Sequence, residues 1–138
     1  MTAKEFLMRA RRLQARIDQL EEARRTAWER STSVTAAPGG TAGAAGAAAH
    51  VSRKTAAYGE YVAQIDDERD RLAEIKADTL KIINKVSDNT LATLLIAYYI
   101  NGQTWEQTAV SIHYSYYRTV HDKHPQALAE VEKLLQKM

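Results

Sequence analysis

Apolar or small side chains recur along residues 4–30 at intervals that alternate between four and three residues. They are Phe6, Ala10, Leu13, Ile17, Leu20 and Ala27, with Arg24 interrupting the series. This spacing forms one stripe on a helix and matches the heptad pattern of helices that pair along a seam. A similar series covers residues 58–86, as Tyr58, Tyr61, Ile65, Leu72, Ile75, Thr79, Ile82 and Val86, with Glu68 as the exception. The sequence therefore predicts two long helices of comparable length.

The segment between these helices, at about residues 31–57, consists mainly of Ala, Gly, Ser and Thr. It offers too little apolar surface to offset the entropy lost on ordering, so we expect a flexible linker with a short helical part. Residues 1–30 carry a net charge of +3 and residues 58–87 a net charge of −2. Opposite charge and similar length favour an antiparallel hairpin within one chain. Pairing between chains is the alternative, and a four-helix dimer would combine the two.

The pattern shortens from Ser87 onward, where "SDNT" supplies helix-capping residues. Leu91, Leu94, Leu95 and Tyr98 would share one helix face, and Asn101–Gly102 would end that helix. Thr104 is expected to cap a second short helix, and Ser115 a third one after the break "HYS". Pro125 would end the third helix or open the next one. We thus expect an all-α fold with a helical hairpin or coiled coil over residues 1–86 and a small helix-turn-helix domain over residues 87–138.

Two short helices joined by a tight turn form the helix-turn-helix pattern of many DNA-binding proteins. Ala109 would allow the helices to cross closely, and Tyr116 and Val120 would anchor the second helix from behind. In such proteins the first helix lies across the phosphate backbone, and the second reads the major groove.

The stretch "YYINGQTWEQTAVSIHYSYYRTVHDKHPQAL" resembles the C-terminal half of small phage proteins with a sigma-factor-like helix-turn-helix, the ArpU and RinA types of late-transcription regulator. The start, "MTAKEFLMRARRLQARID", is also similar to the opening of that group. His113 stands where the group often has Gly, Thr108 where Ile is usual, and Pro125 where Gly is usual. The resemblance implies sequence-specific binding of double-stranded DNA in phage gene regulation, in the cytoplasm of a bacterial host.

The candidate DNA-binding residues follow from their places in this pattern. Tyr117, Arg118 and His121 would point outward toward a groove, where Arg118 can donate two hydrogen bonds to guanine. Ser115 would cap its helix first and contact phosphate second. Gln103, Thr104 and Gln107 would lie where the first helix meets phosphates. For Tyr117 and His121 the alternative is packing on a neighbouring helix, and for Arg118 it is a solvated surface position.

Other functions find less support in the sequence. The chain has no cysteine, and His113, His121 and His124 lack an acidic partner at a recognised metal-binding spacing, so we expect neither a metal nor another cofactor. There is no catalytic constellation, and we expect no enzyme activity. No apolar run is long enough for a membrane span.

The net charge of residues 88–138 is −1, so one copy should bind DNA weakly. We therefore expect a homo-oligomer, with a dimer favoured, because two linked copies raise each other's effective concentration on DNA. A small terminase-type DNA-packaging subunit is one alternative. The other is an adaptor whose degenerate helix-turn-helix binds a protein such as host RNA polymerase.

Overall fold

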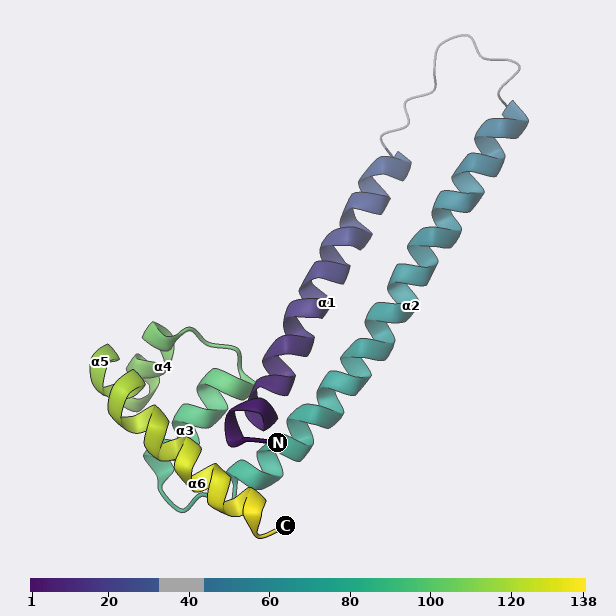
Figure 1. Ribbon diagram of the computed structural model, residues 1–138. Coiled ribbons are helices and arrows are strands. Elements are labelled where there is room, and N and C mark those ends of the chain that lie inside the picture. Colours follow the sequence, from purple (N-terminus) through teal and green to yellow (C-terminus); the bar gives the residue numbers. More distant parts are fainter. Residues whose placement is uncertain (33–43) are drawn as a thin grey trace. The chain divides into compact units, whose positions relative to one another are not determined.

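The computed structural model describes residues 1–32 and 44–138, and all regular structure in these two ranges is helical, which confirms the all-α fold (Figure 1). The elements are α1 (Ala3–Thr32), α2 (Ala44–Ile83), α3 (Asn89–Leu95), the π-helical η2 (Ile96–Ile100), α4 (Trp105–Ile112), α5 (Tyr116–Arg118), the π-helical η3 (Thr119–Lys123) and α6 (His124–Gln136). They form two compact units. One is residues 15–70, the hairpin unit, and the other is residues 1–14 with 71–138, the terminal unit.

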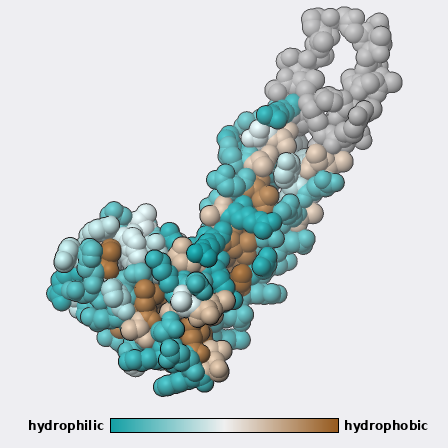
Figure 2. All heavy atoms as spheres, viewed as in Figure 1, coloured by the Kyte–Doolittle hydropathy of each residue, from teal (hydrophilic) through white to brown (hydrophobic). Residues whose placement is uncertain are grey.

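In the hairpin unit, the described parts of α1 and α2 pair antiparallel within the chain (Figure 1). Ile17 and Ile65 are buried, as the heptad pattern predicted. Glu21 forms an ion pair with Arg69. On the face drawn in Figure 2, hydrophobic side chains follow the long helices lengthwise between hydrophilic ones. The hairpin is therefore held by a narrow apolar seam with charged flanks.

α2 begins at Ala44, earlier than the start expected near Tyr58. Its first residues are rich in alanine, which has the highest intrinsic helix propensity, so a segment that composition suggested to be a linker is helical from that residue on. The remainder of the expected linker, residues 33–43, lies outside the described residues.

The terminal unit has a core built from both ends of the chain. Leu7 of α1, Ile83 of α2, Leu94 of α3 and Val131 of α6 are fully buried together. Phe6 was expected to be buried in this turn of α1, but Leu7 is the buried residue. Phe6 is half-buried and packs against the edge of the core. The expected domain boundary between residues 86 and 87 falls inside this unit.

The caps predicted at the starts of the short helices are in place, but the helix that begins at Tyr116 does not break at Pro125, because α5, η3 and α6 follow one another without a gap to Gln136. Asp88 caps α3 by accepting hydrogen bonds from the amides of Thr90 and Leu91. Gly102 has a φ of +70°, which a residue without Cβ adopts at little cost, and it follows η2. Tyr99 is the fully buried tyrosine of η2, whereas the expected Tyr98 is half-buried. In residues 1–32 and 44–138, no helix has both the length and the apolar character to cross a membrane.

Candidate nucleic-acid interface

The helix-turn-helix segment, residues 104–123, comprises α4, a three-residue turn, α5 and η3. Its inner side is formed by buried Thr108, Ala109 and Ile112 of α4 and by Thr119 of η3. The Tyr114 amide donates a hydrogen bond of 3.1 Å to the Ala109 carbonyl and closes the turn. The expected small residue at the helix crossing, Ala109, is thus in place.

The inner side of α5 and η3 differs from the expectation. Tyr116 was expected to point inward, but its side chain is 49% exposed, so this expectation is wrong. Thr119 takes the inner position with 0% exposure, and its hydroxyl donates a 2.7 Å hydrogen bond to the Ser115 carbonyl. Val120 is half-buried.

The π turn explains why Thr119 is the inner residue. An α-helix turns by about 100° per residue, so Thr119 and Ala127 would lie about 80° apart around a regular helix axis. A π turn contains one extra residue, which reduces this difference to about 20°. The His124 amide donates to the Thr119 carbonyl, as this wider turn requires. Thr119 and Ala127 can therefore both be buried.

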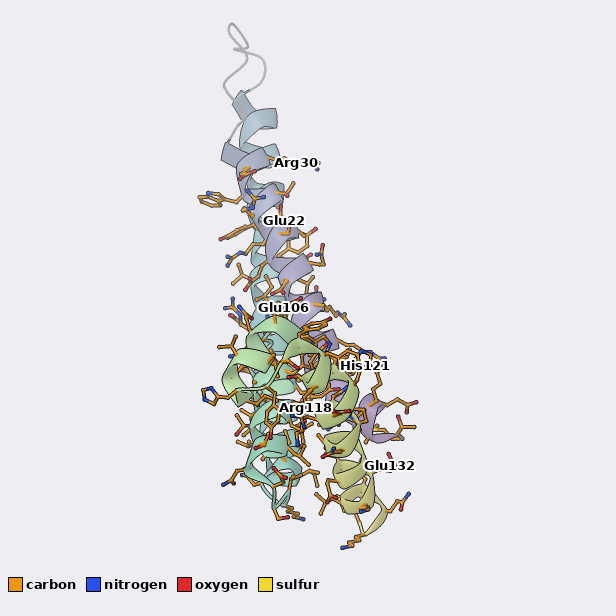
Figure 3. The ribbon with its side chains drawn as sticks, turned by 90° about the vertical axis from the view of Figure 1, so that its left-hand side faces the viewer. Glu22, Arg30, Glu106, Arg118, His121 and Glu132 are labelled. Atoms are coloured by element: carbon orange, nitrogen blue, oxygen red, sulfur yellow. The ribbon has the colours of Figure 1, made fainter. Side chains whose placement is uncertain are left out.

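The three residues predicted to face a groove are all exposed. Tyr117 is 67% exposed, and its ring centre lies 4.4 Å from that of His121. Arg118 places its guanidinium carbon 5.2 Å from the Tyr114 ring centre, and its Nε lies 3.6 Å from the Asp122 Oδ2. Figure 3, in which Arg118 and His121 are labelled, shows both side chains on this part of the terminal unit.

The other four predicted site residues all take part in local hydrogen bonds. Thr104 and Gln107 form a capping box, in which each side-chain oxygen accepts from the backbone amide of the other. The Ser115 hydroxyl oxygen accepts from the Arg118 amide at 3.2 Å. The Gln103 side-chain oxygen accepts from the Ser111 hydroxyl at 3.0 Å. These contacts use acceptor oxygens, so the hydroxyl and amide hydrogens remain as donors for a phosphate.

Sequence reasoning missed Lys123. Its Nζ lies 4.8 Å from the Tyr114 ring centre, so it shares that ring with Arg118. In a regular helix, residues five apart point in different directions, which hid this pairing. Pro125, two residues further on, was the available signal, because proline disturbs the hydrogen bonding of the preceding turn.

A stack of planar groups supports the start of α4. The Arg11 guanidinium lies 4.0 Å from the Tyr98 ring centre, and Tyr98 stacks on Trp105 with ring centres 3.8 Å apart. Arg11 also donates from Nη1 to the carbonyls of Tyr98 (2.8 Å) and Gln103 (3.2 Å). A side chain from α1 thus holds the loop before α4 in position.

His124, which follows η3, is joined to this stack. Its ring centre lies 4.5 Å from that of Trp105, and its Nε2 lies 2.6 Å from the Tyr99 hydroxyl oxygen. Burial, with a smaller contribution from Lys4, lowers the pKa of His124 to about 4. Burial also raises the pKa of Tyr99. Near neutral pH both groups are therefore uncharged, and they share one hydrogen bond between the Tyr99 hydroxyl and the His124 Nε2.

No model of a protein family matches this chain, and no curated protein or solved structure matches it either. Within the part of the chain that the structure describes, no three His, Cys, Asp or Glu side chains are grouped to hold a metal ion.

Proposed function

We propose that this protein binds double-stranded DNA sequence-specifically through its helix-turn-helix segment and regulates transcription of phage genes, in the manner of a late-gene activator. The resemblance of residues 98–128 to the ArpU and RinA types of regulator supports this proposal. The segment has the two short helices and the tight turn that such a reader requires.

The observation that carries the proposal is the division of α5 and η3 into two sides. Thr119 is buried, whereas Tyr117, Arg118 and His121 are exposed on consecutive turns. Arg118 can donate a pair of hydrogen bonds to O6 and N7 of guanine in the major groove. Tyr117 offers an apolar ring edge to a thymine methyl and a hydroxyl to a phosphate.

Because the interface has little positive charge, a second copy of it would raise the affinity for DNA. Residues 88–138 carry a net charge of −1, and Asp122 lies beside Arg118. Few phosphate contacts per copy release few counterions, so one copy gains little affinity. A homodimer that places two helix-turn-helix segments on one duplex would raise the affinity of both.

The test is a selection from a random duplex library, followed by binding titrations of the selected and a scrambled duplex over a range of salt concentrations. Arg118→Ala should lower the preference for the selected duplex by a factor of about 5 to 150, because a bidentate arginine–guanine contact contributes about 1–3 kcal/mol of discrimination. Lys137→Ala, which removes an exposed cation near the end of α6, is the matched control and should leave the preference unchanged. If the wild-type protein selects no sequence at low salt, direct reading of DNA is contradicted.

One observation favours a second candidate function, binding of a protein such as host RNA polymerase. Val110 of α4 is 75% exposed, which is high for an apolar residue on a short helix of this segment. In that case Val110→Lys should abolish binding to purified RNA polymerase. The same variant should leave DNA binding unchanged or slightly stronger.

A further inference from the structure

The Tyr114 ring holds two cations that come from different turns. The Arg118 guanidinium carbon lies 5.2 Å from the ring centre, and the Lys123 Nζ lies 4.8 Å from it. Tyr114 belongs to the turn between α4 and α5 and is half-buried against the core. The ring is therefore a platform that both cations contact at the surface of the helix-turn-helix segment.

The π turn η3 is what brings the two cations together. Residues five apart lie about 140° from each other around an α-helix, so Arg118 and Lys123 would diverge in a regular helix. In a π turn, the hydrogen bond joins residues five apart, and such residues lie on nearly the same face. Pro125 favours this widening, because it lacks an amide hydrogen and its ring conflicts with the carbonyl four residues earlier.

We infer that Lys123 is a phosphate-binding residue of this interface, held by η3 and Tyr114 beside Arg118, and that it binds the DNA backbone next to the base pair that Arg118 reads. The inference rests on the proposed DNA-binding function. A lysine ammonium is a compact charge that suits a phosphate, whereas the planar guanidinium of Arg118 suits the edge of guanine. Contact with the ring limits the freedom of both side chains before binding, which lowers the entropy lost when DNA binds.

Asp122 restricts Arg118 and not Lys123. Its Oδ2 lies 3.6 Å from the Arg118 Nε, which leaves the two terminal guanidinium nitrogens as the donors directed at a base. The Tyr114 ring is a weak acceptor for the Lys123 ammonium, so this ammonium can exchange the ring for a phosphate at little cost. The two cations thus have separate roles on one platform.

The experiment measures binding of the selected and the scrambled duplex against salt for Lys123→Gln. Affinity for both duplexes should fall by the same factor, and the slope of log affinity against log salt should decrease by about 1. The advantage of wild type over the variant should therefore shrink about fourfold between roughly 50 and 200 mM salt. Arg118→Ala should instead reduce the preference between the two duplexes.

Two further variants test whether affinity depends on the position of the Lys123 ammonium at Tyr114 or only on the net charge of the protein. Lys123→Gln combined with Gln126→Lys restores the net charge at an exposed position three residues further along the chain and should not restore affinity. Tyr114→Leu keeps an apolar side chain but removes the ring, and it should lower affinity for both duplexes although no charge changes. Tyr114→Phe is its control and should bind as wild type. Thermal melts of each variant exclude loss of the fold as the cause.

The possible outcomes separate this inference from the proposed function. If wild-type protein does not bind either duplex at low salt, the proposed function fails and the inference with it. If wild type binds and Arg118→Ala loses preference, but Lys123→Gln keeps the wild-type salt slope, the inference alone is overturned.

A phospholipid headgroup offers the same phosphate chemistry. A Lys123→Gln variant that loses binding only to phosphatidylglycerol vesicles, and not to duplex, would also overturn it.

Discussion

His124 is the residue whose environment differs most from the one that its sequence position suggested. It follows the exposed part of η3, yet its ring contacts Trp105 and its Nε2 lies 2.6 Å from the Tyr99 hydroxyl oxygen. Its burial follows from the π turn, which rotates the chain after Thr119 so that α6 packs on the core. A histidine next to the exposed residues Tyr117, Arg118 and His121 is thereby part of the packed core that supports them.

The free energy of unfolding should depend on the protonation of His124. Its folded-state pKa of about 4 is below the usual 6.5. The unfolded chain therefore takes up a proton near pH 6.5 and the folded chain only near pH 4. The contribution of neutral, buried His124 to the free energy of unfolding is complete above pH 6.5 and is lost as the pH falls from 6.5 toward 4. We expect a loss of about 1–2 kcal/mol between pH 7 and pH 4.5, after allowance for partial exposure.

Urea unfolding at both pH values measures this effect. His124→Gln cannot titrate and should show a loss smaller by the same amount, while His113→Gln, at an exposed position, should behave as wild type. Equal pH dependence in wild type and His124→Gln would contradict the assignment, whatever the absolute stability of the variant.

At the scale of elements, periodicity and capping residues predicted most of the helices, because these signals act within a few residues. The hairpin seam at Ile17 and Ile65 and the caps at Thr104 and Ser115 are confirmed. The inward place given to Tyr116 is wrong, because a π turn depends on tertiary packing that a regular 3.6-residue period does not represent. The pairing of Lys123 with Arg118 escaped sequence reasoning for the same reason.

The turn between α4 and α5 contains strain that a substitution can remove. His113 ends α4 with a φ of 61°, in the left-handed region that costs a residue with Cβ about 1–2 kcal/mol. Its side chain is exposed, so little contact would be lost. His113→Gly should raise the free energy of unfolding by about 0.5–1 kcal/mol, since glycine's greater freedom in the unfolded chain offsets part of the gain.

Gly102→Ala is the reciprocal control. Gly102 has a φ of +70° with no atom within 4 Å of an added Cβ, so any loss reports backbone strain alone. Denaturant unfolding should show this variant less stable by about 1 kcal/mol. A His113→Gly protein that is less stable than wild type would indicate that the imidazole makes a stabilising contact.

At the scale of the whole molecule, the proposed function requires more than one copy of the interface. Each chain supplies one helix-turn-helix segment, and residues 88–138 carry a net charge of −1. This requirement could be predicted from the charge of the sequence alone. The division into two compact units could not be predicted, because the terminal unit joins residues 1–14 to residues 71–138 and such long-range association has no local signal.

Light scattering at roughly tens of micromolar protein should give twice the 15.5 kDa mass of the chain, because the oligomer is favoured at concentrations above its dissociation constant. The selected DNA site should then contain two related half-sites in inverted orientation, as expected for a twofold-symmetric dimer. A mass of 15.5 kDa under these conditions would remove the argument from effective concentration.

The hydrogen bond from the Ala3 amide to the Glu132 carboxylate, 2.7 Å long, joins residues separated by 129 positions in the chain. Its consequence concerns the order of folding during synthesis. The hairpin unit is complete once residue 70 has left the ribosome, and its contacts connect a contiguous segment. The terminal unit cannot close until α6 has emerged, and the early turns of α1 must wait for it, so its slow step should be the search for this distant partner.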